Sequence, residues 1–127
     1  MVYKKDDKPI DIDVIDKWLE TFFLDPFTSY LDETIFRIDL FETAEEFILE
    51  ALLLEYNKNE VSVFLTEDKI LIEANHYQGD EHKTRMISFP FSIVHHRVKA
   101  TFESGVLEVF ISKNIVCHGK KRVVPLP

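Results

Sequence analysis

The five histidines and the single cysteine are the side chains of this sequence that could bind a metal ion. His95 and His96 are adjacent, so in a strand they point to opposite faces and cannot share one ion without a bend. The spacing of His76, His82 and His118 is not typical of metal ligands. We therefore predict no metal site and interpret the histidines as surface residues.

Cys117 and His118 are the pair that comes nearest to a nucleophile and its base. Adjacent side chains diverge in an extended chain, and a catalytic thiolate also needs a positioned base and an oxyanion site. The carboxylates are scattered, and no glycine-rich loop follows a strand to bind phosphate. The sequence therefore predicts no enzyme: no catalytic residue, no cofactor and no small-molecule substrate.

The overall charge limits the classes of partner. A net charge of −8 repels nucleic acid and anionic membrane surfaces, and the basic cluster of residues 120–122 is too small to reverse this. The longest apolar run, around Leu52 to Leu54, is too short to span a bilayer. One cysteine cannot close an internal disulfide, and the first residues are charged, so we expect a reducing, cytoplasmic location.

An amphipathic helix is predicted near the N-terminus, ending at Asp25-Pro26. Its apolar residues follow the helical spacing i, i+3, i+4, i+7 and i+8, namely Ile15, Trp18, Leu19, Phe22 and Phe23. A helix this short is not stable alone and must pack its aromatic side against another surface.

From residue 35 onward, apolar and polar residues alternate with the period of β-strands. About seven short segments, separated by turns at intervals of roughly 8 to 12 residues, indicate an all-β, immunoglobulin-like sandwich. Residues 46–53 would also suit a helix, but the regular turns on both sides favour a strand. We divide the chain into an N-terminal arm (1–33), a sandwich (34–113) and an extended C-terminal tail (114–127).

One motif gives this sandwich a family resemblance. Ala100, Gly105, Val106 and Leu107, within ATFESGVL, resemble the A-x-x-x-n-G-V-L hallmark of the small heat-shock proteins, which contain the α-crystallin domain. Physically, Gly105 permits a tight turn, and Leu107 starts a strand that returns into the core beside Ala100.

Three further segments resemble motifs of the same family in the same order. Residues 85–90 resemble the strand end R-x-F-x-L-P, and residues 24–27 resemble W-D-P-F of the N-terminal arm, with Leu in place of Trp. Residues 124–126 resemble the I-x-I/V motif of the C-terminal tail. Together these matches cover most of residues 24–126.

The sequence also departs from the common family pattern. Leu53-Leu54-Glu55 replaces Leu-Pro-Gly, and Ser112-Lys113 replaces Pro-Lys. The loop of residues 75–83 is shorter than the loop that carries a domain-swapped strand in bacterial and plant members, which argues against that dimer. Such divergence is similar to the spore-coat branch of the family in Gram-positive spore formers.

The resemblance implies an ATP-independent holdase that binds partly unfolded clients and assembles into homo-oligomers. It places a groove between two strands, lined by Val61, Val63, Leu65, Val98 and Ala100. The tail of a neighbouring subunit would add to that groove as a strand, with Val124 and Leu126 as anchors. The client-binding arm would consist of Trp18, Phe22, Phe23 and Phe27.

Several alternatives remain open. The groove residues could simply form the core or a dimer interface, because a sandwich needs inward residues on every strand. The aromatic arm could pack on its own domain. The chain could also be a structural assembly protein located in a spore coat, without client holding, or a β-sandwich co-chaperone that docks on a larger chaperone.

Overall fold

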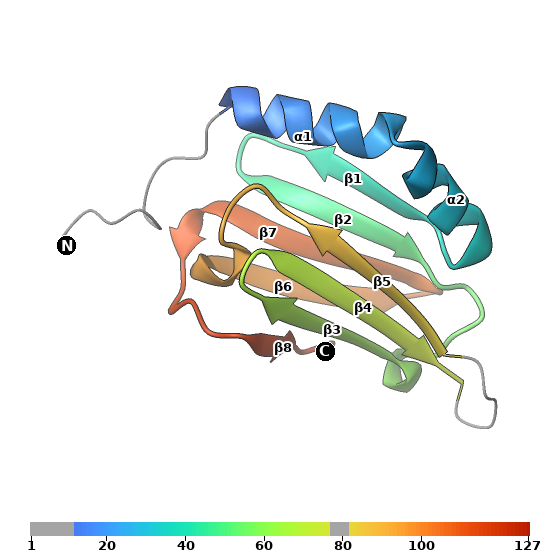
Figure 1. The fold of residues 1–127 in the computed structure, drawn as a ribbon. Coiled ribbons are helices and arrows are strands. Elements are labelled where there is room, and N and C mark those ends of the chain that lie inside the picture. Colours follow the sequence, from blue (N-terminus) through green and yellow to red (C-terminus); the bar gives the residue numbers. More distant parts are fainter. Residues whose placement is uncertain (1–11, 77–81) are drawn as a thin grey trace.

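The computed structural model describes residues 12–76 and 82–127, and within these residues it forms two antiparallel four-stranded sheets packed face to face (Figure 1). The back sheet has the order β1 (Ile38–Glu42), β2 (Glu46–Leu52), β7 (Val106–Val116) and β6 (His96–Glu103). The front sheet has the order β5 (His82–Ser88), β4 (Lys69–Asn75), β3 (Val61–Thr66) and β8 (Arg122–Val124). The predicted all-β sandwich is confirmed.

The core lies between the two sheets because alternate residues of each strand face inward. Strand β2 shows this clearly, since Phe47, Leu49 and Ala51 are buried while their neighbours are half-buried. This is the stretch whose composition also suited a helix, and pairing with β1 and β7 on either side makes it a strand. Tertiary pairing therefore overrides the local propensity.

Two helices precede the sandwich, where the sequence analysis expected one. Helix α1 (Ile12–Leu24) ends at the predicted place, but Pro26 also begins a second helix, α2 (Pro26–Thr34). Asp25 caps α2, because its Oδ1 accepts a hydrogen bond of 2.9 Å from the Phe27 amide. Proline suits the first turn of a helix as well as it stops the preceding one.

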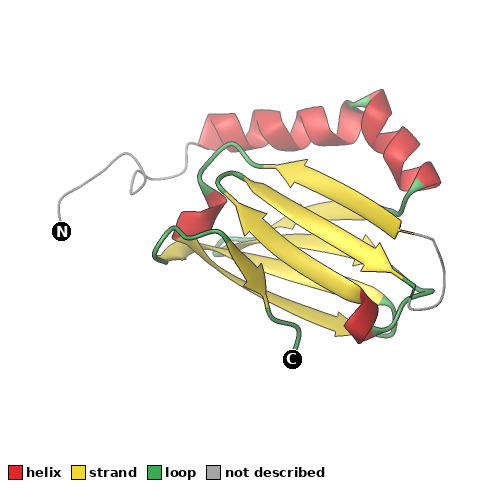
Figure 2. Ribbon diagram, turned by 60° about the horizontal axis from the view of Figure 1, so that its bottom comes forward, coloured by secondary structure: helices red, strands yellow, loops and turns green. Residues whose placement is uncertain are grey.

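Helix α1 packs against the sandwich at the side where β1 and β5 are the edge strands, opposite β8 (Figures 1 and 2). The Trp18 indole N–H donates to the Ser88 carbonyl at 2.8 Å. Its ring lies 6.0 Å from that of Phe47 and 4.8 Å from that of Phe89. Ile15 is buried beside it. The helix therefore completes the core at one open side of the sandwich.

The hallmark motif forms the turn between β6 and β7. Ser104 and Gly105 have φ angles of 51° and 78°, the left-handed values of a tight hairpin. A Cβ on Gly105 would lie 2.6 Å from Cα of Leu54, so a side chain there would clash with backbone. The Gly105 carbonyl accepts a hydrogen bond of 2.7 Å from the Leu53 amide. Glycine is required both for the turn and for this close approach.

Candidate functional site

The C-terminal tail forms a strand against β3 of its own chain. Strand β8 pairs antiparallel with β3, and Val124 lies opposite Val63. Val124 is 3% exposed, and half-buried Leu126 also packs against the core. The Lys58 ammonium donates to the Pro127 carbonyl at 2.7 Å. Both predicted tail anchors thus pack against the sandwich of their own chain, whereas the family resemblance implied docking on a neighbouring subunit.

The predicted groove residues lie on β3 and β6, one strand from each sheet. Val61, Val63 and Leu65 of β3 face the interior and are at most 7% exposed. Ala100 of β6 is buried, and Val98 is half-buried against the core. These side chains belong to the core, and the tail covers the side of the core that opens between β3 and β6.

Arg122 fastens the tail to the back sheet. Its guanidinium donates to the carbonyl of Val94 at 2.9 Å, in the 3₁₀ turn before β6, and to that of His96 at 2.8 Å, the first residue of β6. From sequence, Arg122 is predicted only as part of the basic cluster of residues 120–122. Its spacing from Val124 was the available signal, because residues i and i+2 of a strand share a face. Arg122 therefore faces the groove and positions the strand.

The segment between β7 and β8 also fits closely against the sandwich. Gly119 has φ of 78°, and a Cβ there would clash with the imidazole ring of His95. The Cys117 amide donates to the His95 carbonyl at 2.8 Å. Strand β7 itself continues to Val116, into the segment assigned to the tail from sequence. The connection from β7 to β8 is therefore short and follows the His95 side chain.

The prediction that all histidines lie at the surface is wrong for His96. Its side chain is buried beside the Phe91 ring at 4.8 Å, and Nδ1 donates to the Ser112 carbonyl at 2.8 Å. Burial lowers the pKa of His96 below its ordinary 6.5, and the charge of nearby His95 lowers it further, while the bond to Ser112 partly opposes the shift. The fold therefore favours the neutral imidazole at the base of the tail.

We expect this burial to make the stability depend on pH. The unfolded state binds a proton to His96 more readily than the folded state, so the free energy of unfolding falls as the pH drops below about 6.5. The variant His96→Asn keeps a donor for the Ser112 carbonyl but does not titrate. Urea midpoints at pH 7.5 and pH 5.5 should show a larger acid-induced loss for the wild type, whereas equal losses would contradict this assignment.

The predicted client-binding arm divides into two parts. Trp18 and Phe22 pack against the core, as the self-docking alternative expected. Phe23 and Phe27 are 50% and 61% exposed, and Phe27 stacks on exposed Tyr30 at 6.1 Å between ring centroids. With exposed Leu24, they place apolar surface at the junction of α1 and α2.

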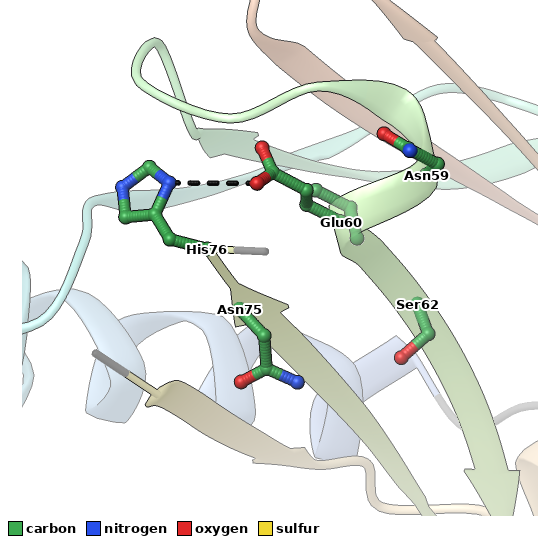
Figure 3. A pocket seen from close by; sticks show the side chains of 6 residues that line it. Asn59, Glu60, Ser62, Asn75 and His76 are labelled. Atoms are coloured by element: carbon green, nitrogen blue, oxygen red, sulfur yellow. Dashed lines mark ion pairs between the residues drawn. The ribbon is translucent and has the colours of Figure 1, made fainter. Parts of the chain in front are cut away.

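A shallow pocket lies at the ends of β3 and β4, next to the loop whose residues 77–81 lie outside the described part of the chain (Figure 3). His76 Nδ1 is 3.6 Å from Oε2 of Glu60, and the Tyr56 ring stacks on His76 at 4.3 Å.

Among the described residues, no group of three or more His, Cys, Asp or Glu side chains is placed to hold a metal ion. In the same residues, neither helix has the length and apolar character to cross a bilayer.

The chain is similar to one known spore coat protein and to the solved structures of small heat-shock proteins. No model of a known protein family matches it. The chain is 33% identical over 113 residues to Spore coat protein M of Bacillus subtilis (strain 168), covering 89% of this chain and 84% of that protein. Heat shock protein 16.0 from Schizosaccharomyces pombe has the same fold, with a TM-score of 0.51, 22% identity and coverage of 69% and 94% of the two chains. A small heat-shock protein from Xylella fastidiosa also has this fold. Its TM-score is 0.50 and its identity 20%, and the match covers 65% of this chain and 88% of that protein.

Proposed function

Because this chain belongs to the α-crystallin-domain small heat-shock protein family, in the branch of Spore coat protein M, we propose that it is a self-assembling structural protein of the spore coat. The observation that carries the proposal is the strand β8, which fills a groove of the sandwich at the end of a short connection. The protein acts without catalysis, by binding other copies of itself. The spore coat, rather than the cytoplasm, is the location that the relative supports.

Assembly follows from exchange of the tail between copies. A strand added to a sheet edge is held by backbone hydrogen bonds and by alternate side chains, which a tail of either origin supplies equally. Val124 and Leu126 contribute about 1.5 to 3 kcal/mol each when buried, less the cost of ordering the tail. One exchanged tail is therefore a weak link. Many exchanged tails at high effective concentration hold an oligomer together.

The hydrogen bonds of Arg122 favour docking of the tail on another copy over a tail that stays undocked. Among the described residues, its guanidinium donates to backbone carbonyls, those of Val94 and His96 in the sandwich and that of Lys120 in the tail itself. Every copy offers the same carbonyls, so an incoming tail recovers both groove bonds. Exchange therefore costs little once the connection from β7 to β8 opens.

ATP-independent holding of unfolding clients is the second candidate function. The exposed apolar residues Phe23, Leu24, Phe27 and Tyr30 at the junction of α1 and α2 favour it, since exposed apolar surface can bind other chains. The client-binding arm proposed here therefore consists of these four residues, because Trp18 and Phe22 pack against the core. Such holding is compatible with self-assembly, because helices α1 and α2, which carry these residues, lie on the side of the sandwich opposite the C-terminal strand (Figure 2).

Two measurements separate these functions. Under the holdase hypothesis, the chain suppresses light scattering of a heated model client without ATP, and Phe27→Ser with Tyr30→Ser removes most of this effect. Ile115→Ser, which alters an exposed apolar residue of β7, serves as the control. Under the coat hypothesis, a tagged chain expressed in sporulating Bacillus subtilis in place of its relative is recovered in coat extracts. Recovery only in the soluble cytoplasmic fraction would reject the coat role.

A further inference from the structure

The outer face of the front sheet carries one continuous row of apolar side chains. In the strand register, Met86 lies opposite Leu71, Leu71 opposite Phe64, and Phe64 opposite Val123. Met86 and Val123 are 55% and 61% exposed, and the other two are half-buried. This row, here called the apolar stripe, crosses all strands of the sheet that lies in front in Figure 1. The tail supplies its last residue.

The residues flanking the apolar stripe are polar and nearly symmetric about it. Thr84 and Ser62 lie on one side, and Ser88 and Thr66 on the other. Between them, β4 presents Lys69, Leu71 and Glu73, so the two charges on either side of the stripe have opposite signs. The two charged residues are four positions apart, about 13 Å along a strand, which is too far for an ion pair within one chain.

We propose that the apolar stripe is an interface at which a second copy of this chain stacks, front sheet on front sheet, deepening the self-assembly proposed above. A two-fold axis running along the stripe places each apolar residue against its equivalent. The same axis brings Lys69 of each copy opposite Glu73 of the other. Lys69 pairs with Asp68 on the same surface, at 3.0 Å, and this exposed pair exchanges at little cost.

The outer face of the back sheet has a different charge pattern, which disfavours the same stacking. This face also has an apolar row, formed by Phe41, Ile48 and Phe110. In β2, however, Glu46 and Glu50 flank Ile48 on both sides. The same two-fold stacking would place these carboxylates opposite each other, and like charges at an interface are unfavourable. The charge pattern therefore favours stacking through the front sheet.

The size of the face indicates how strong the contact is. Four strands span about 19 Å, and six residues of strand about 20 Å, so two stacked faces cover about 800 Å² in total. Specific stable interfaces bury about 1,200 to 2,000 Å². Stacking is therefore a weak contact that acts together with tail exchange. Because Val123 belongs to β8, docking of a tail completes the stripe.

Charge reversal tests the stacked interface. Lys69→Glu places two pairs of like charges across the interface. We therefore expect the protein concentration at which half of the chains are assembled, measured by sedimentation of the full chain, to rise about tenfold. The double variant Lys69→Glu/Glu73→Lys restores opposite charges and should return assembly to the wild-type range. Lys99→Glu, on the exposed back-sheet surface, changes the net charge by the same amount and serves as the control.

Each outcome of this series decides the proposal. Rescue by the double variant supports stacking, because these two residues are too distant to interact within one chain. Equal behaviour of Lys69→Glu and Lys99→Glu, or failure of the double variant to recover in a chain with an unchanged circular dichroism spectrum, overturns stacking and leaves tail exchange intact. A wild-type chain that stays monomeric up to millimolar concentration overturns both stacking and the proposed self-assembly.

Discussion

Deletion of residues 123–127 should reduce the protein from oligomers to monomers or small species. The deletion removes Val124, which is 3% exposed, together with Leu126 and the pairing of β8 with β3. Under the proposed tail exchange, every subunit loses one outgoing and one incoming contact, so the loss multiplies with the number of subunits. Light scattering of the full and shortened chains measures the effect as a drop of at least several-fold in mean mass.

The control for this deletion is Lys121→Ser, which changes an exposed tail residue next to β8 and should leave the mass unchanged. Shortening the chain also uncovers Val63 and Leu65, so the free energy of unfolding must be measured in parallel. A shortened chain that is less stable but has the mass of the full chain would mean that the tail serves only its own groove.

Breaking the ion pair between Asp32 and Arg85 should destabilise the fold by about 3 to 5 kcal/mol. Arg85 Nη1 lies 2.5 Å from Asp32 Oδ1 and also donates to the Phe36 carbonyl at 2.9 Å. The Arg85 side chain is 3% exposed, so Asp32→Asn leaves a buried cation without its counter-charge. The pair joins β5 of the front sheet to α2 and to the start of β1, where Asp32 also accepts from the Ile38 amide.

Urea unfolding of Asp32→Asn and Arg85→Met measures this loss. The exposed pair of Arg37 with Asp39 is the matched control, and Arg37→Met should cost less than about 1 kcal/mol because solvent screens it. The double variant Asp32→Leu/Arg85→Met should recover part of the stability, since it removes both charges together. A loss at Asp32→Asn no larger than at Arg37→Met would show that the pair contributes little.

The strand pattern was predictable because inward and outward residues alternate along nearly every strand. Even β2, with its helix-forming composition, follows this rule. Helix α2 was missed because Asp25-Pro26 is both a stop signal and a start signal, and only the first was considered. The burial of His96 was also missed, because its partner is the Ser112 carbonyl, sixteen residues away, and no local pattern predicts it.

The sequence predicted candidate groove and tail residues, but it could not predict the path of the chain that joins them. The family resemblance predicted Val63 and Ala100 as groove residues and Val124 as a tail anchor, and these roles stay predictions. The structure places all three side chains in the core. Which chain supplies the tail depends on the path of residues 117–121 around His95, and a motif contains no information about that path. The apolar stripe could not be predicted from sequence either, because its residues align only in the register of the front sheet.

A mixed-chain disulfide experiment tests the exchange of tails most directly. Val63 and Val124 lie directly opposite each other inside the sandwich. Chains carrying Cys117→Ser with Val63→Cys are mixed with chains carrying Cys117→Ser with Val124→Cys, and the mixture is then oxidised. Tail exchange predicts a covalent dimer that contains one chain of each kind, formed only in the mixture. Absence of that dimer, in conditions where a chain carrying both cysteines closes its own disulfide, would show that the tail stays in its own groove.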